Sequence, residues 1–368
     1  MASKPLELHL KSAAEYGIIC TMTQENSFRI DFLKFVCAIF VVALHSYALI
    51  LSGDVGSWTW FLDNILVDGG LCRIAVPFFF LCSGYFLAKH LDTRQEWWGA
   101  VKKRMRTLVV PFFIWNWIFV VYLIIVRSAT DIFLGRPLGT TVRDLDWLSI
   151  LGVNWVAPLL NPLWYVRNLF FLILLAPIIF FFVKKLGRVW LVLCLLGAIF
   201  YWLIPGEAAR HFWYCFFSLS GLFYFSLGLY LFQNKRELNF TSNRLMYGGV
   251  LVVFLLGGML FFAAKGCGDA RRMVEAVALP VMIFLAWHFA PAYQLPKWLR
   301  NMSFPIFILH PFFGSFLSNT MKYGNILRDL PRIRGSICFI VGIFASIAVA
   351  HLLRRYCPRF ARLAFGER

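Results

Sequence analysis

The sequence has few charged side chains, because Asp, Glu, Lys and Arg make up only 15% of its 368 residues. A water-soluble domain of ordinary composition carries about 25%. Hydrophobic residues reach 60% and aromatic residues 18%. A chain of this length with so little charge cannot cover itself with a polar surface. The composition therefore indicates an integral membrane protein whose main solvent is lipid.

Patterns that hold metal ions are also missing. No two cysteines are spaced as CxxC and no HExxH occurs. Most of the nine cysteines lie inside apolar runs, where we expect them to act as small packing residues. The sequence thus predicts neither a metal site nor a disulfide framework.

Acidic residues are scarce, which leaves 36 Lys and Arg against 18 Asp and Glu and a formal net charge of +18. Such a balance alone is typical of nucleic-acid binding. The basic residues cluster between the apolar runs, however, as they do in loops that meet anionic lipid headgroups. We therefore expect the lipid bilayer as a partner and no nucleic acid.

The first 29 residues lack the basic start, apolar stretch and cleavage site of a secretory signal. We expect residues 1–29 to form a cytoplasmic tail, with Met22 as a second candidate start of translation. Low-complexity tracts and obvious repeats are missing as well. Any chemistry is therefore expected within the membrane or beside it.

Apolar runs long enough to cross a bilayer predict an all-α, polytopic membrane protein with about ten transmembrane helices. More Lys and Arg fall on the cytoplasmic side when both termini are placed there, which favours that orientation in a multi-pass protein of the cell membrane. We expect one transmembrane domain over 30–353 and a basic cytoplasmic tail over 354–368. The predicted spans are 30–52, 70–89, 108–126, 162–183, 189–204, 212–233, 246–264, 273–290, 303–320 and 336–353.

Polar side chains form a stripe on the first predicted helix. Asp31, Lys34 and His45 are separated by three and eleven residues, which brings them to nearly one face at about 100° per residue. Such groups are costly in an apolar span, so the stripe is a candidate site. Two interpretations are open for Asp31 and Lys34. Their side chains either extend from a helix end toward water, or they belong to a polar path that leads to His45. For His45 the alternative to chemistry is a structural bond to a neighbouring helix.

Further candidates lie near other predicted spans. Arg73 lies at the outer end of the second span, near the depth of His45, where it either extends outward or holds an anionic ligand. A basic cluster before the third span binds either lipid headgroups or a phosphate-bearing cofactor. Interfacial anchoring competes with substrate binding for Trp164, whereas Arg167 and His310 lie deeper in their spans. The basic cluster consists of Lys102, Lys103, Arg104 and Arg106.

Five stretches of the chain, in order, carry a family resemblance: Asp31-Phe-Leu-Lys34 followed by His45, then AVPFFFLCSGYF, KKRMRTLVVPFF, PLWYVRNLFF and SFPIFILHPFF. Together with the predicted spans they cover nearly the whole chain. The sequence resembles the acyltransferase 3 family, polytopic membrane enzymes that modify bacterial envelope carbohydrates. One departure is that Lys34 stands where the family usually has arginine. Lysine keeps the positive charge but lacks the planar guanidinium with its paired donors.

The resemblance implies an O-acetyltransferase that moves an acyl group, usually acetyl, from cytosolic acetyl-CoA to a carbohydrate hydroxyl in the bacterial plasma membrane. His45 is then the candidate general base. The basic cluster would hold the cofactor phosphates, and Lys34 would line the passage toward the histidine. Acceptor binding or oxyanion stabilisation falls to Arg73, Trp164, Arg167 and His310.

A transporter or flippase for a lipid-linked glycan is the main alternative, because many spans with intramembrane Arg and His also suit a translocation path. A glycerolipid acyltransferase is disfavoured, since no histidine is followed by aspartate at the spacing which that class uses. Direct transfer and an acyl-enzyme route both stay open. The acceptor sugar, the acyl chain and the oligomeric state are not specified by the sequence.

Overall fold

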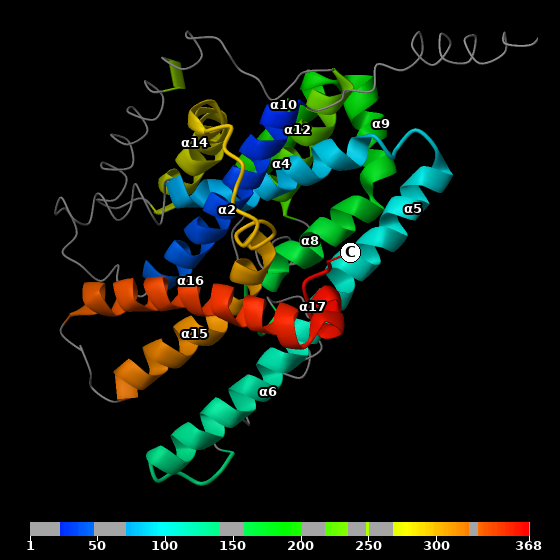
Figure 1. Cartoon of the computed structure of the whole chain (residues 1–368). Coiled ribbons are helices and arrows are strands. Elements are labelled where there is room, and N and C mark those ends of the chain that lie inside the picture. The colour runs from blue at the N-terminus through cyan, green and yellow to red at the C-terminus, as the bar shows by residue number, and fades with distance from the viewer. Residues whose placement is uncertain are drawn as a thin grey trace, which may run out of the picture.

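The computed structural model describes residues 23–47, 71–139, 158–200, 218–234, 248–249, 268–323 and 330–367. These residues form helices and turns without a strand, which confirms the predicted all-α class. The helices pack into one bundle (Figure 1). In chain order they are α2 (Gln24–Tyr47), η2 (Leu71–Ile74), α4 (Ala75–Ala88), α5 (Arg94–Arg104), η3 (Met105–Val109), α6 (Val110–Phe133), α8 (Leu163–Leu174), α9 (Ala176–Leu186), α10 (Arg188–Phe200), α12 (Leu219–Gln233), α14 (Gly268–Phe289), α15 (Ser303–Tyr323), α16 (Pro331–Tyr356) and α17 (Pro358–Ala364).

Among the described residues, three helical stretches are long and apolar enough to cross a membrane: Leu71–Ala88, Arg94–Phe133 and Ile333–Tyr356. A bent pair of helices makes a fourth when it is counted as one span. Only 22% of the apolar window of Ile333–Tyr356 is buried inside the protein, so most of that surface faces outward. Outward-facing apolar helices are typical of proteins in lipid. The count of about ten spans and the orientation of the termini stay predictions, and almost all of 246–264 lies outside the described residues.

The predicted span 162–183 is divided into α8 and α9, which meet at an angle of 66°. The break falls at Leu175, two residues before Pro177. Proline lacks the amide hydrogen that would bond the carbonyl of Ile173, and its ring crowds that carbonyl. Pro177 therefore indicates the bend in the sequence, although the apolar run alone predicted one straight span.

The segment with the basic cluster is helical, rather than a loop that leads into the third span. α5 begins after Thr93, whose hydroxyl accepts a hydrogen bond from the Glu96 amide at 3.2 Å. α5 and α6 run on as one rod (Figure 1), joined by the π-helical turn η3. Pro111 follows this turn and cannot donate to the carbonyl of Thr107. The π-helical turn accommodates that missing donor.

α4 and α12 pack closely because glycines face each other's backbones. A Cβ atom added to Gly84 would lie 2.1 Å from the carbonyl oxygen of Phe225. One added to Gly228 would lie 2.1 Å from the carbonyl oxygen of Leu81. Small residues that permit such close backbone approach are the usual basis of helix association in membranes, because the hydrophobic effect does not favour association within lipid.

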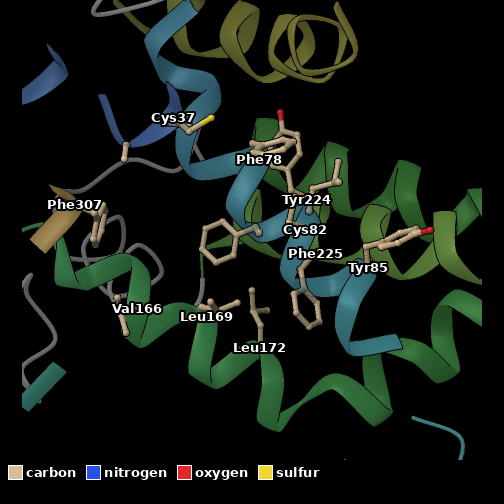
Figure 2. Close-up of a cluster of buried hydrophobic side chains, with 14 of the residues drawn as sticks. Cys37, Phe78, Cys82, Tyr85, Val166, Leu169, Leu172, Tyr224, Phe225 and Phe307 are labelled. Atoms are coloured by element: carbon tan, nitrogen blue, oxygen red, sulfur yellow. The ribbon is translucent and has the colours of Figure 1, made fainter. Parts of the chain in front are cut away.

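Around this helix pair, side chains from five helices fill a continuous apolar core (Figure 2). Aromatic rings from α4, α12 and α15 contribute to it, and each ring buries a large area. The residues labelled there are Cys37 of α2, Phe78, Cys82 and Tyr85 of α4, Val166, Leu169 and Leu172 of α8, Tyr224 and Phe225 of α12, and Phe307 of α15.

Gly84→Ala is expected to destabilise the protein by about 1–3 kcal/mol, since the new methyl group forces α4 and α12 apart. The measurement is the melting temperature of the purified protein in detergent. Gly197→Ala is the matched control, because nothing lies within 4 Å of a Cβ added there. Equal melting temperatures for the two variants would contradict the close contact between α4 and α12.

Candidate functional site

Two histidines from distant parts of the chain meet where α2 packs against α15. The ring centroids of His45 and His310 are 5.2 Å apart. His310 is only 2% exposed, whereas His45 is exposed. On α16, Gly342 faces both helices, with its added Cβ 3.2 Å from Val42 and 3.8 Å from the Cβ of His310. The missing side chain at this glycine lets three helices converge around the histidine pair.

The backbone of α15 fixes the tautomer of His310. Its Nδ1 lies 3.0 Å from the carbonyl oxygen of Ile306, which can only accept a hydrogen bond, so Nδ1 carries the proton. The carbonyl of Phe307 is a second acceptor, because Pro311 lacks the amide that would normally bond it. Nε2 is buried and has no hydrogen-bond partner among the described residues. In the neutral ring, Nε2 is therefore the nitrogen with the lone pair.

A positive charge lies beside this pair. Arg73 is exposed in η2, which packs on α2, and it is close enough to His45 to interact with it electrostatically. Two imidazoles and a guanidinium thus come from three separate elements. This arrangement can accept a proton and stabilise a negative oxygen in one place.

Lys34 lies nearer the N-terminus of α2 than His45 does. Its Nζ is 3.7 Å from a carboxylate oxygen of Asp31 and 5.3 Å above the ring of Phe86 on α4. Both charged side chains are partly exposed, so this ion pair contributes little to stability. The eleven-residue separation from His45 corresponds to about 16 Å along the axis. Lys34 is therefore on the predicted stripe but does not contact the histidine.

The basic cluster straddles the end of α5 and the turn η3. Three of its side chains, those of Lys102, Lys103 and Arg106, are exposed, whereas Arg104 is half-buried. Partial burial and the positive charges of Lys89 and Lys103 lower the pKa of His90 from its ordinary value. The turn between α4 and α5 thus extends the cluster by two residues that the sequence analysis missed. Lys89 ends the predicted span 70–89, and His90 directly follows it.

Tyr165 is another residue that the sequence analysis did not select. Its ring packs edge-on against Phe307 of α15 at 5.8 Å between centroids and against Phe80 of α4 at 4.8 Å. Its hydroxyl bonds to Ser83, and Arg104 is in electrostatic range. Contacts with α4 and α15 identify it as an internal residue rather than an interfacial anchor. It lies between the basic cluster and the helix that carries His310.

The remaining predicted residues are on α8. Trp164 is half-buried, and Arg167 is buried with 8% of its surface exposed. Asn168, its neighbour, is 1% exposed. The structure therefore brings together His45, His310 and Arg73 and places Trp164 and Arg167 on a separate helix. α8 reaches the histidine helix through Tyr165.

Metal ligands do not gather in the part of the chain that the structure describes: no three His, Cys, Asp or Glu side chains there lie close enough to hold an ion.

Comparison with curated proteins gives two informative relatives. A succinoglycan biosynthesis protein, ExoH, of Rhizobium meliloti (strain 1021) is 31% identical over 180 residues, which are 48% of this chain and 45% of that protein. A serine/alanine racemase of Enterococcus gallinarum is 25% identical over 304 residues, which are 77% of this chain and 40% of that protein. The chain thus spans less than half the length of either relative.

No solved structure matches this chain. The family model Acyl_transf_3, described as an acyltransferase domain, matches residues 28–355. This range contains all three residues that meet at the histidine pair, together with the basic cluster and α8. The chain therefore belongs to the acyltransferase 3 family.

Proposed function

We propose that this protein is an O-acyltransferase of the bacterial cell membrane that moves an acyl group, acetyl in the first instance, from cytosolic acyl-CoA to a hydroxyl of a cell-envelope carbohydrate. The observation that carries the proposal is the contact between His45 and His310 beside Arg73. Membership of an acyltransferase family supports the reaction class. The proposal includes about ten spans with both termini in the cytoplasm.

His45 is the general base in this mechanism. A carbohydrate hydroxyl is a poor nucleophile, and its proton must leave as its oxygen bonds to the thioester carbon. His45 accepts that proton, while Arg73 stabilises the negative charge on the carbonyl oxygen. The carbon–sulfur bond then breaks, the ester is released, and the proton passes to the thiolate of coenzyme A. No covalent enzyme intermediate is needed.

Exposure separates the roles of the two histidines. His45 is exposed and is available to a substrate, whereas His310 is held by its own backbone. Buried Nε2 of His310 is an acceptor beside His45. We assign His310 to orienting the base and the acceptor hydroxyl through this lone pair.

Donor binding falls to the basic cluster. Coenzyme A carries several phosphate oxygens, which Lys and Arg hold by charge-assisted hydrogen bonds. Lys102 and Lys103 are exposed at the end of α5, and Arg106 is exposed in η3. Arg104 is in electrostatic range of Tyr165. Lys34 would line the passage from this entrance to His45.

The acceptor is assigned only as an envelope carbohydrate. Trp164 offers an aromatic face for a sugar ring and Arg167 offers hydrogen bonds from α8. The relative named as a succinoglycan biosynthesis protein supports a polysaccharide or its lipid-linked precursor. The racemase match covers 40% of that protein, so its named activity is not assigned to this chain.

His45→Ala is expected to lower kcat by about 10²–10⁴-fold, because the hydroxyl attacks without a base. The assay follows thiol release from acetyl-CoA by purified protein in the presence of envelope glycan extract. Membrane abundance of the variant should equal that of the wild type.

Two results would overturn this assignment. Full turnover in His45→Ala removes the histidine from the mechanism. Glycan translocation by the wild-type protein without any dependence on acetyl-CoA supports the flippase instead.

Lys103→Gln combined with Arg106→Gln is expected to raise KM for acetyl-CoA about tenfold with little change in kcat, because two phosphate contacts are lost far from the reacting atoms. The measurement is the dependence of the initial rate on acetyl-CoA concentration. Lys184→Gln combined with Lys185→Gln is the matched control, since both lysines are exposed at the end of α9. An equal rise in KM for both pairs would show a general charge effect rather than a site.

A further inference from the structure

The C-terminal segment folds back onto the bundle. α16 ends at Tyr356, and α17 then turns the chain toward α6 (Figure 1). The predicted tail 354–368 therefore contains a helix and a turn. We call residues 354–367 the C-terminal hook.

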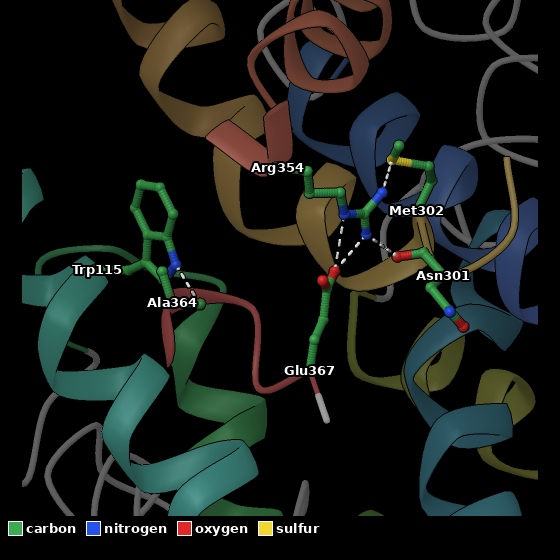
Figure 3. A network of polar contacts seen from close by, with 6 residues as sticks. All are labelled: Trp115, Asn301, Met302, Arg354, Ala364 and Glu367. Atoms are coloured by element: carbon green, nitrogen blue, oxygen red, sulfur yellow. Dashed lines mark hydrogen bonds and ion pairs between the residues drawn. The ribbon is translucent and has the colours of Figure 1, made fainter. Parts of the chain in front are cut away.

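Arg354 anchors the hook to the start of α15. It forms an ion pair with Glu367, and its guanidinium also donates to the carbonyl oxygen of Asn301 at 3.1 Å (Figure 3). A third contact reaches the sulfur of Met302 at 3.2 Å. Asn301 has a positive φ of 65°, an uncommon backbone conformation for a residue with a side chain. The guanidinium thus fixes the chain immediately before the helix that carries His310.

The other end of the hook contacts the rod of α5 and α6. The indole nitrogen of Trp115 donates to the carbonyl oxygen of Ala364 at 2.6 Å (Figure 3). The Trp115 ring stacks on Phe365 at 5.7 Å between centroids. A Cβ added to Gly366 would lie 2.4 Å from the carbonyl oxygen of Thr107, and Gly366 has a φ of +62°. Only glycine fits this contact with the backbone of η3.

The turn that receives the hook departs from α-helical geometry. A π-helical turn is less favourable than an α-helix, and Pro111 withholds the donor that the Thr107 carbonyl would otherwise have. Arg106, a member of the basic cluster, directly precedes Thr107 in this turn. Gly366 therefore packs against the turn that carries Arg106, and Phe365 packs against Trp115 of α6.

We propose that Arg354, Gly366 and Glu367 are positioning residues, which hold the basic cluster in the geometry that binds the phosphates of acyl-CoA. This inference rests on the proposed function, since it takes acyl-CoA as the donor. The hook also contacts residues that precede the histidine helix. The hook thereby connects the turn that carries Arg106 with the start of the helix that carries His310.

The test compares Gly366→Ala and Glu367→Gln with Arg362→Gln, an exposed change of charge on α17. The two hook variants are expected to raise KM for acetyl-CoA about tenfold while kcat and KM for the acceptor change by less than about twofold. Arg362→Gln should keep all three constants at wild-type values. Each single change, Arg354→Glu or Glu367→Arg, should raise KM for acetyl-CoA. The double variant, which exchanges the two charges of the ion pair, should restore part of the loss.

A second measurement covers variants that fold poorly: the shift in melting temperature on addition of free coenzyme A, in detergent. We expect a clear shift for the wild type and for Arg362→Gln and a smaller shift for Gly366→Ala and Glu367→Gln. Equal shifts in all four proteins, or a loss of kcat with KM unchanged, would overturn the positioning role. A wild type without any shift and without turnover of acetyl-CoA would instead overturn the proposed function.

Discussion

Placing an imidazole among apolar helices is costly, and the packing of α2 against α15 brings two of them together at a ring distance of 5.2 Å. Everything assigned to the site depends on this contact. Gly342 gives the three helices room to converge, and the carbonyl of Ile306 sets the tautomer of His310. Because His310 is buried and held while His45 is exposed, the pair has one fixed and one available ring. Such an asymmetry suits a base that must meet a substrate in a defined orientation.

The proposed site has two positively charged parts, and different elements support them. Arg73 lies next to the histidine pair in a short 3₁₀ turn. The basic cluster is on a rod whose π-helical turn contacts the C-terminal hook. Tyr165 packs against Phe307 of the helix that carries His310, and its hydroxyl bonds to Ser83. An acyl-CoA donor that binds at the basic cluster and reacts at His45 would therefore pass α4, α8 and α15, which contact one another through Tyr165.

Much of this organisation follows from the sequence, in part because local rules decide it. The spacing of Lys34 and His45 determines their common face, and Pro311 beside His310 leaves a backbone carbonyl open to the ring. Contacts between distant segments could not be predicted in the same way. Nothing in the pattern indicates that His310 would meet His45 rather than another helix. Tyr165 resembles an interfacial anchor until its tertiary neighbours are known, and Gly366 has a role only because Thr107 lies against it.

The central claim, that acyl transfer occurs at the histidine pair, is tested most directly by an experimental structure of the protein with a non-reactive acyl-CoA analogue bound in a lipid nanodisc. The account predicts the acyl carbon about 3–3.5 Å from where an acceptor oxygen hydrogen-bonded to His45 would lie, with the phosphates on the basic cluster. An analogue bound away from α2 and α15, with the His45 ring facing lipid and no passage to that cluster, would contradict it.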